Sequence, residues 1–177
     1  MGPSGSGKST LLSYISGTLD AGFAAQGQVK LNGTDITDLA PEARHVGILF
    51  QDDLLFPHLS VGENLAFGLR ASIKGRAERK RKIDAALEDI GLGGFATRDP
   101  DTLSGGQKAR VALMRMLLSG PKALLLDEPF SRLDTERRDQ IRELVFAQAR
   151  ANGLPVLLVT HDHADADAAG GRVHRLD

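Results

Sequence analysis

The chain has 177 residues, of which 41% are hydrophobic and 25% are charged, and these values are typical of a single globular domain with its own core. Its 22 lysines and arginines nearly balance its 23 aspartates and glutamates, so the charge does not indicate a nucleic-acid partner and we expect none. The absence of cysteine excludes a disulfide framework, a thiolate metal site and a cysteine nucleophile. The densest apolar runs, 123–126 and 155–159, are far shorter than the ~18–20 residues of a membrane span. We therefore expect any association with a membrane to go through a partner.

The chain opens on a pattern that is typical of phosphate-binding loops, G-x-x-x-x-G-K-[ST]. Its small residues let the backbone curl until successive N–H groups point at one polyphosphate, and a helix that starts near Lys8 adds the positive end of its dipole. The Lys8 ammonium would reach the β- and γ-phosphates of a nucleotide, and the Ser9 hydroxyl would bind Mg²⁺. The alternative is a glycine-serine turn that caps an ordinary helix. The residues predicted to contact the nucleotide are Gly2, Pro3, Ser4, Gly5, Ser6, Gly7, Lys8, Ser9 and Thr10.

The first half of the chain continues with one helix, two strand signals and a longer helical stretch. Helical periodicity follows the loop, and Gly17 is the expected end of that helix. Residues 28–33 indicate a strand and a turn, because Asn-Gly is a strong hairpin signal. Residues 46–50 are an apolar run typical of a buried strand. From 61 to about 90 the pattern is helical, and the glycines that follow end it.

The second half alternates helices with strands. We predict helices over about 104–118 and 134–151, and buried strands at 123–127 and 156–160. A short helix and an edge strand are expected to finish the chain. Strands that alternate with helices predict an α/β fold with a parallel sheet flanked by helices.

Two adjacent carboxylates, Asp127 and Glu128, close the predicted strand 123–127. Ligands of open α/β sheets gather at the carboxyl ends of the strands. Asp127 would therefore help to hold Mg²⁺, and Glu128 would orient the attacking water or accept its proton. The alternative is a strand that ends in a solvated acidic turn, but the phosphate-binding loop in the same chain favours a nucleotide site.

The run Leu103-Ser104-Gly105-Gly106-Gln107 has two interpretations. Ser104 and Gln107 have the spacing of a capping box, which closes the start of a helix. A capping box does not require both glycines, whereas a backbone that approaches an anion is helped by them. With these residues, the chain resembles the ATP-binding subunit of an ABC transporter. The resemblance implies that Ser104, Gly105, Gly106 and Gln107 bind the γ-phosphate of an ATP held on the phosphate-binding loop of a second copy.

Three further motifs match that family in the same order along the chain. The resemblance implies that Gln51 contacts Mg²⁺ or the attacking water. It also implies that His161 contacts the γ-phosphate, although a lone histidine at a strand end is usually structural. Residues 131–134 match a loop that crosses the dimer interface, but Arg132 stands where the family more often has alanine. The implied catalytic residues are Glu128, His161 and Gln51, the implied metal ligands are Ser9, Gln51 and Asp127, and Asp134 joins the implied nucleotide contacts.

The segment 50–64 is similar to prokaryotic importer ATPases for small solutes. Its apolar, proline-bent loop is suited to receive a helix of a membrane partner. The resemblance implies an ATPase that uses ATP and Mg²⁺ and dimerises head to tail with a second copy of itself. It would power an integral membrane permease at the cytoplasmic face of the cell membrane, together with a solute-binding protein. We expect one domain over 1–177, a P-loop NTPase core of 1–60 and 104–177 with a helical subdomain at 61–103.

One departure concerns the start of the chain. Family members have a strand that runs into the loop, preceded by further strands and by an aromatic residue that stacks on adenine. Only Met1 precedes the loop here, and Tyr14 lies downstream of it. A strand missing from inside a sheet leaves its neighbours with unpaired backbone groups, so we expect these 177 residues alone to be poorly stable or to hydrolyse ATP weakly.

Three explanations of the chain stay open at this point. In the first, Met1 is an internal methionine of a working ATPase subunit. In the second, the chain is a truncated remnant with weak activity or none. In the third, it is a soluble ABC-type ATPase that acts on nucleic acid or ribosomes, although it has neither the coiled-coil insertion nor the tandem cassettes of such relatives.

Overall fold

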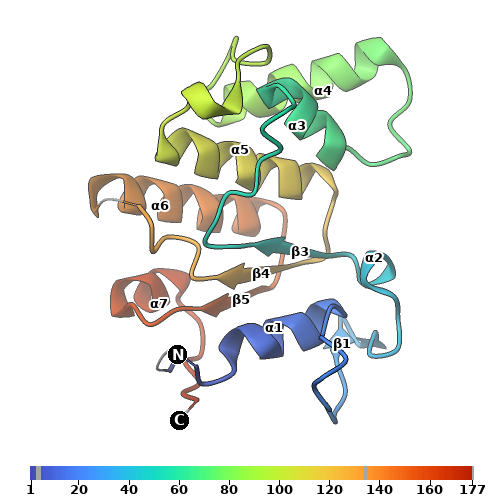
Figure 1. Cartoon of the computed structure of the whole chain (residues 1–177), viewed down its shortest axis with the longest axis vertical. Helices are drawn as coiled ribbons and strands as arrows, with labels where there is room; N and C mark the ends of the chain where they lie inside the picture. Colours follow the sequence, from blue (N-terminus) through green and yellow to red (C-terminus); the bar gives the residue numbers. More distant parts are fainter. Residues whose placement is uncertain (3–4, 134, 177) are drawn as a thin grey trace.

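The computed structural model describes residues 1–2, 5–133 and 135–176. Its centre is a parallel sheet of β3 (Val46–Leu49), β4 (Ala123–Asp127) and β5 (Val156–Val159), in the order β3-β4-β5 (Figure 1). These are the strands that the apolar runs predicted, with β3 and β5 each ending one residue earlier than expected. Because the strands are parallel, their carboxyl ends lie at one edge of the sheet. The predicted α/β fold with a parallel sheet flanked by helices is confirmed.

Helices cover both faces of this sheet, with α1 on one face and α5 and α6 on the other (Figure 1). Leu124 and Leu126 of β4 pack with α5 and α6 in one buried cluster, while Leu125 between them packs against Leu12 of α1. Successive side chains of a strand point to opposite faces, so a strand covered on both faces needs an unbroken apolar run. The helices around the sheet are α1 (Lys8–Ser16), α5 (Gly105–Leu118), α6 (Thr135–Ala151) and α7 (His163–Ala169).

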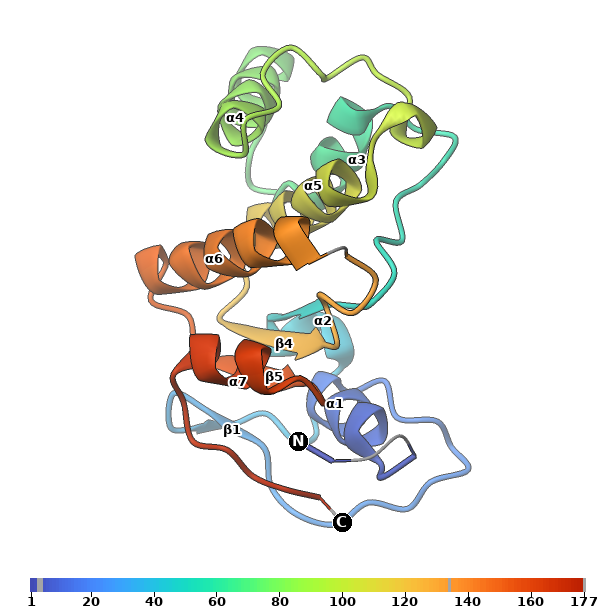
Figure 2. The same ribbon diagram turned by 90° about the vertical axis from the view of Figure 1, so that its left-hand side faces the viewer.

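A second layer of helices lies beyond α5, farthest from α1 (Figures 1 and 2). It contains α3 (Val61–Gly68), α4 (Arg76–Asp89) and the short 3₁₀ helix η1 (Pro100–Thr102). The prediction of one helical stretch from 61 to about 90 is wrong in its middle. The chain leaves the helical conformation at Leu69, which has extended backbone, and α4 starts only after Gly75, which has a φ of 89°.

Helix α5 connects the two layers through different faces. Ala112 and Leu113 belong to the cluster that contains β4 and α6, whereas Val111 and Met114 belong to the cluster built by α3 and α4. The helical layer and the sheet layer therefore share one rigid helix, and that helix begins at the predicted γ-phosphate motif. No helix in the described part of the chain is long and apolar enough to cross a membrane.

The segment between α1 and β3 is tied to the end of α1. Helix α1 ends at Gly17, as predicted, and Asn32-Gly33 turns the small hairpin β1 (Lys30–Leu31) and β2 (Thr34–Asp35) with φ angles of 51° and 80°. Both positive angles are what a tight hairpin turn requires. Arg44, the last residue of the short helix α2 (Pro41–Arg44), is buried and donates hydrogen bonds to the Tyr14 and Ile15 carbonyls.

The end of the chain differs from the prediction. The described residues after α7, 170–176, form no strand, so the predicted edge strand is wrong. Instead the segment makes two backbone hydrogen bonds with Met1: the Met1 amino group donates to the His174 carbonyl at 2.5 Å, and Leu176 N–H donates to the Met1 carbonyl at 2.8 Å. Two bonds to a single residue are too few for a strand ladder. Figure 2 shows the two termini close together below β5.

Candidate active site

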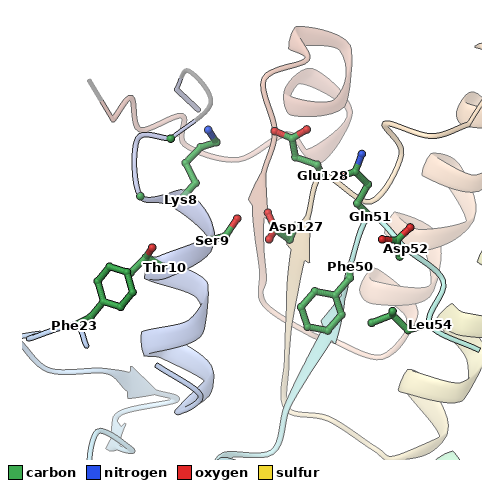
Figure 3. Close-up of a pocket in the computed structure, with 12 residues that line it drawn as sticks. Lys8, Ser9, Thr10, Phe23, Phe50, Gln51, Asp52, Leu54, Asp127 and Glu128 are labelled. Atoms are coloured by element: carbon green, nitrogen blue, oxygen red, sulfur yellow. The ribbon is translucent and has the colours of Figure 1, made fainter. Parts of the chain in front are cut away.

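A cavity of about 710 Å³ opens at the carboxyl edge of the sheet. It lies between the start of α1 and the loops that follow β3 and β4 (Figure 3). Its volume is that of a small-molecule site. Many of the predicted site residues line this cavity, and most of these are polar. The full lining is Gly5, Gly7, Lys8, Ser9, Thr10, Phe23, Phe50, Gln51, Asp52, Leu54, Asp127 and Glu128.

The phosphate-binding loop forms one wall of this cavity. Gly5 and Gly7 have φ angles of 85° and 82°, in the left-handed region where a side chain would be strained. Gly7 immediately precedes α1, so the positive end of that helix lies next to this wall of the cavity. The Lys8 side chain is only 7% exposed, and its Nζ donates to the Gly2 carbonyl at 2.9 Å across the loop. The described residues of the loop, 1–2 and 5–8, thus fit the curled geometry that the sequence predicted.

The chemistry of the loop fits a bound phosphate. Ser6 Oγ is buried and has no hydrogen-bond partner within the residues that the structure describes. Ser6 itself does not line the cavity, so the groups of the loop that could face a bound phosphate are the backbone of Gly5 and Gly7 and the side chain of Lys8. Ser9 and Thr10 follow on the first turn of α1 and line the cavity. Pro3 and Ser4 lie outside the described residues.

Glu128 is held in an unusual conformation beside the predicted histidine. Its φ is 47°, which costs free energy for a residue with a side chain and is often found at functional sites. Its backbone N–H donates to the Val159 carbonyl at 2.9 Å, and its own carbonyl accepts from Ser131 Oγ at 2.8 Å. His161 Nδ1 lies 3.0 Å from Glu128 Oε2. The sheet therefore brings together two residues that are 33 positions apart in sequence (161 − 128).

The loop after β3 forms the opposite wall. Gln51 and Asp52 both line the cavity, and Asp52 makes an ion pair with Arg132 of the loop that was predicted to cross a dimer interface. Arg132 departs from the family pattern, and this contact gives it a role in connecting the two loops. Asp134, which the sequence placed among the nucleotide contacts, lies outside the described residues.

The protein oxygens in the cavity could bind Mg²⁺ only if nucleotide phosphates supplied further ligands. Ser9 and Asp127 face the same space from α1 and β4 (Figure 3), and Gln51 lines it from the other wall. In the described ranges, no three histidine, cysteine, aspartate or glutamate side chains are grouped closely enough to hold a metal ion. Mg²⁺ is commonly bound by one or two protein oxygens and completed by phosphates and water, so this sparse oxygen set matches its chemistry.

The motif at the start of α5 stands outside the cavity. Ser104 and Gln107 form a complete capping box: Ser104 N–H donates to Gln107 Oε1 at 2.9 Å, and Gln107 N–H donates to Ser104 Oγ at 3.3 Å. Gly105 is exposed, and a Cβ added there would meet no other atom within 4 Å. None of the residues 104–107 lines the cavity. The capping interpretation is confirmed, and the exposed glycine leaves the helix start accessible to a ligand from outside the chain.

Asp162, the residue after the predicted histidine, caps the start of α7. Asp162 Oδ1 accepts from Ala164 N–H at 2.7 Å and from Asp165 N–H at 3.4 Å, and Arg138 donates to the other oxygen at 2.6 Å. Partial burial acts to raise the pKa of this carboxyl. The two backbone bonds and two arginine charges outweigh that effect, so its pKa lies below the ordinary value of 3.8.

We expect Asp162→Ala to lower the free energy of unfolding by about 1–2 kcal/mol at neutral pH, because a helix loses its cap. A carboxyl with a lowered folded-state pKa stabilises the fold above its ordinary pKa of 3.8 and loses that effect as the pH falls through its folded value. The difference between wild type and variant should therefore shrink in acid. Urea unfolding at neutral and acidic pH measures it. Asp162→Asn is the control, since asparagine caps without the charge. An equal loss at every pH would contradict the electrostatic part.

Three apolar side chains of the cavity were not predicted as lining residues, namely Phe23, Phe50 and Leu54. Phe50 and Leu54 flank Gln51 in the chain, so their neighbourhood was a usable signal. Phe23 lies in a loop without periodicity or motif, and its place in the wall follows from how that loop folds back toward α1.

A phosphate-binding loop and an acidic pair at the end of a parallel strand, facing one cavity, define a P-loop nucleotide-hydrolase site. Comparison with known proteins refines that class. The family model described as ABC transporter matches residues 1–131. The chain therefore belongs to the ABC transporter family, as an ATP-binding subunit of the importer type, and it is an ATPase of that family.

Individual relatives match over almost the whole chain. The uncharacterized ABC transporter ATP-binding protein YnjD of Escherichia coli is 54% identical, over 95% of this chain and 77% of that protein. The thiamine import ATP-binding protein ThiQ of a Jannaschia species is 45% identical, over 100% of this chain and 76% of its own length. The sulfate/thiosulfate import ATP-binding protein CysA of Mycobacterium tuberculosis is 44% identical, over 98% of this chain and 48% of its own length.

Proposed function

We propose that this chain binds and hydrolyses ATP with Mg²⁺, and that hydrolysis powers the passage of a small solute through a separate permease. The observation that carries the proposal is the single cavity in which the phosphate-binding loop, Gln51, Asp127 and Glu128 meet. Importers for thiamine and for sulfate or thiosulfate among the relatives support a small solute and a solute-binding protein as partner. The chain would act at the cytoplasmic face of the membrane through its partner.

The residues of the site have different roles in phosphoryl transfer. Lys8 neutralises phosphate charge from the loop side, where its ammonium is already held across the loop. Glu128 takes a proton from the water whose oxygen attacks the γ-phosphorus, as the bond to the β–γ bridging oxygen breaks and ADP leaves. His161, which is not part of the cavity lining, acts as a positioning residue, since its Nδ1 is 3.0 Å from the Glu128 carboxylate. Bound Mg²⁺ would supply further neutralisation of the phosphates next to Ser9 and Asp127.

The working form that we propose is a head-to-tail dimer. The helix start at residues 104–107 lies on the same side of the molecule as the carboxyl edge of the sheet (Figure 1), but it contributes nothing to the cavity of its own chain. Its two glycines and the positive end of α5 are suited to bind an anion. A second copy, turned by half a rotation, would place this helix start over the ATP of the first copy, and the same contact would repeat at the second site.

A hollow beside the active site supports a permease as the partner. A cavity of about 360 Å³ lies between β3 and the helical layer and is lined by Leu54, Phe56, Phe67 and Arg115 among others. Phe67 is 70% exposed and Leu54 is 56% exposed, so two large apolar side chains of this hollow are open to solvent. Because this hollow adjoins the loop of Gln51, a helix seated there would sense the state of the nucleotide.

We expect Phe67→Ser to reduce recovery of an integral membrane protein with the full-length chain by at least about tenfold, while ATP hydrolysis by the chain alone is retained. Phe67 lies outside the nucleotide cavity, so the two readouts are independent. The measurement is affinity purification from detergent-solubilised membranes followed by identification of the retained proteins. A soluble complex with nucleic acid or ribosomes, in place of a membrane protein, would contradict the transport function.

A further inference from the structure

Asp165 is a buried carboxylate to which the proposed reaction gives no role. It lies in the first turn of α7 and is only 2% exposed, and a carboxylate is rarely this buried unless it is paired. Its Oδ1 accepts from Arg142 of α6 at 3.1 Å, so the ion pair joins two neighbouring helices, α6 and α7 (Figures 1 and 2). This contact compensates for the buried charge, but it uses only one of the two carboxylate oxygens.

The second oxygen of Asp165 contacts the carboxyl end of the sheet. Asp165 Oδ2 accepts from the hydroxyl of Thr160 at 3.2 Å, and Thr160, which directly follows β5, is also 2% exposed. The same hydroxyl oxygen accepts from Asp162 N–H at 3.0 Å. A hydroxyl has one proton to donate and a carboxylate can only accept, so Asp165 fixes the direction of the hydrogen bonds of Thr160.

These hydrogen bonds enclose His161. Thr160 and Asp162 are its neighbours in the chain, and the bond between them closes a turn around it. The His161 side chain itself is 65% exposed, and among the described residues the contact with Glu128 is the one polar contact of its ring. An exposed ring has little packing to hold it, so its orientation depends on how firmly the residues on either side are fixed.

We propose that Asp165 and Thr160 are positioning residues that hold His161 in its orientation toward Glu128 and thereby support ATP turnover. The inference rests on the proposed function, which gives Glu128 the transfer of the proton. Neither Asp165 nor Thr160 lines the nucleotide cavity, so both act through His161. A displacement of about 1 Å in a reacting arrangement can lower the rate strongly, which is why a fixed support outside the cavity matters for turnover.

A purely structural role is the alternative, because the ion pair of Asp165 with Arg142 also fastens α7 to α6. The hydroxyl of Thr160 separates the two roles, since it contacts Asp165 but takes no part in the ion pair. Asp139 provides the matched control. Its Oδ1 accepts from the same arginine at 2.6 Å, but its side chain is 66% exposed, and this is its one polar side-chain contact among the described residues.

The first test measures ATP turnover by single variants of the complete protein. Valine has nearly the shape of threonine but lacks the hydroxyl, whereas serine keeps it. We expect Thr160→Val to lower kcat about tenfold with the KM for ATP unchanged, because a positioning residue affects the chemical step rather than binding. Thr160→Ser should retain most of the wild-type kcat. Asp165→Ala should lose turnover as Thr160→Val does, whereas Asp139→Ala should hydrolyse ATP at the wild-type rate.

The second test repeats Thr160→Val and Asp165→Ala in a His161→Ala background. If both residues act through His161, neither substitution should cause a further loss once the imidazole is gone. General damage to the fold would lower turnover in both backgrounds. An equal loss in both backgrounds therefore overturns the proposal. Wild-type turnover in Thr160→Val or in His161→Ala overturns it as well.

A third measurement does not depend on hydrolysis. The chain has five histidines, so the NMR signal of the His161 ring is assigned by its loss in His161→Ala. Without nucleotide, this signal should shift in Thr160→Val and Asp165→Ala and keep its wild-type position in Thr160→Ser and Asp139→Ala. An unchanged signal in Thr160→Val and Asp165→Ala contradicts the inference. If the signal shifts as expected but the wild-type protein does not hydrolyse ATP, the proposed function fails while the positioning of His161 stands.

Discussion

Replacing Glu128 by glutamine is expected to lower steady-state ATP turnover by at least about a hundredfold and to leave ATP binding in place, because general-base catalysis contributes about 10²–10⁴-fold. Glutamine has nearly the same shape as glutamate, so the strained backbone at φ 47° and the hydrogen bond to Val159 can persist. What the variant loses is the carboxylate that accepts the proton. Turnover is measured by phosphate release, and binding by retention of labelled ATP.

Glu143→Gln is the control for this experiment, since Glu143 is an exposed residue of α6 that lies outside the cavity. It should hydrolyse ATP at the wild-type rate. If Glu128→Gln turns over ATP as fast as this control in the complete protein, Glu128 is not the base. If it no longer binds ATP, the side chain acts in binding rather than in the chemical step.

The second large effect concerns the composite site. Gly105→Asp is expected to reduce ATP turnover at least about tenfold, because its carboxylate would face the γ-phosphate of the partner's ATP. A Cβ at this position meets no atom within 4 Å. An acidic residue at the first position of α5 is stabilised by the positive end of the helix dipole. The variant should therefore fold at least as stably as wild type. Gly105→Ala, which adds bulk without charge, should retain most of its activity.

Mixing two inactive variants tests whether the site spans two copies. Lys8→Ala removes the phosphate-binding cation, and Gly105→Asp blocks the helix start. Neither homodimer therefore has an intact site. A mixed dimer regains one intact site, formed by the loop of the Gly105→Asp chain and the helix start of the Lys8→Ala chain. Random pairing should restore roughly a quarter of wild-type turnover, since half of the dimers are mixed and each has one of two sites. Activity that stays at the sum of the two variants would contradict the dimer.

The strands and the main motifs could be predicted because local chemistry required them. The run at 123–127 is apolar without interruption since β4 is buried on both faces, and the glycines of the first loop are needed for left-handed backbone. The capping box at 104–107 was likewise readable from spacing alone. The break between α3 and α4 was missed, although Gly75, which has a φ of 89° directly before α4, was a usable signal.

Other parts of the site depend on contacts between distant segments, and no local pattern encodes them. The contact of His161 with Glu128 exists because β4 and β5 are neighbours, and the ion pair of Arg132 with Asp52 exists because two loops leave adjacent strands. Phe23 reaches the cavity because its loop is tied back to α1 through Tyr14. Residue types and spacings thus predicted a phosphate-binding loop and an acidic pair, since backbone geometry and charge demand particular side chains, and the resemblance to a family then implied an ATPase. Which residues position the Glu128 carboxylate followed from the folded arrangement, because the distance to His161 is set by packing across the sheet.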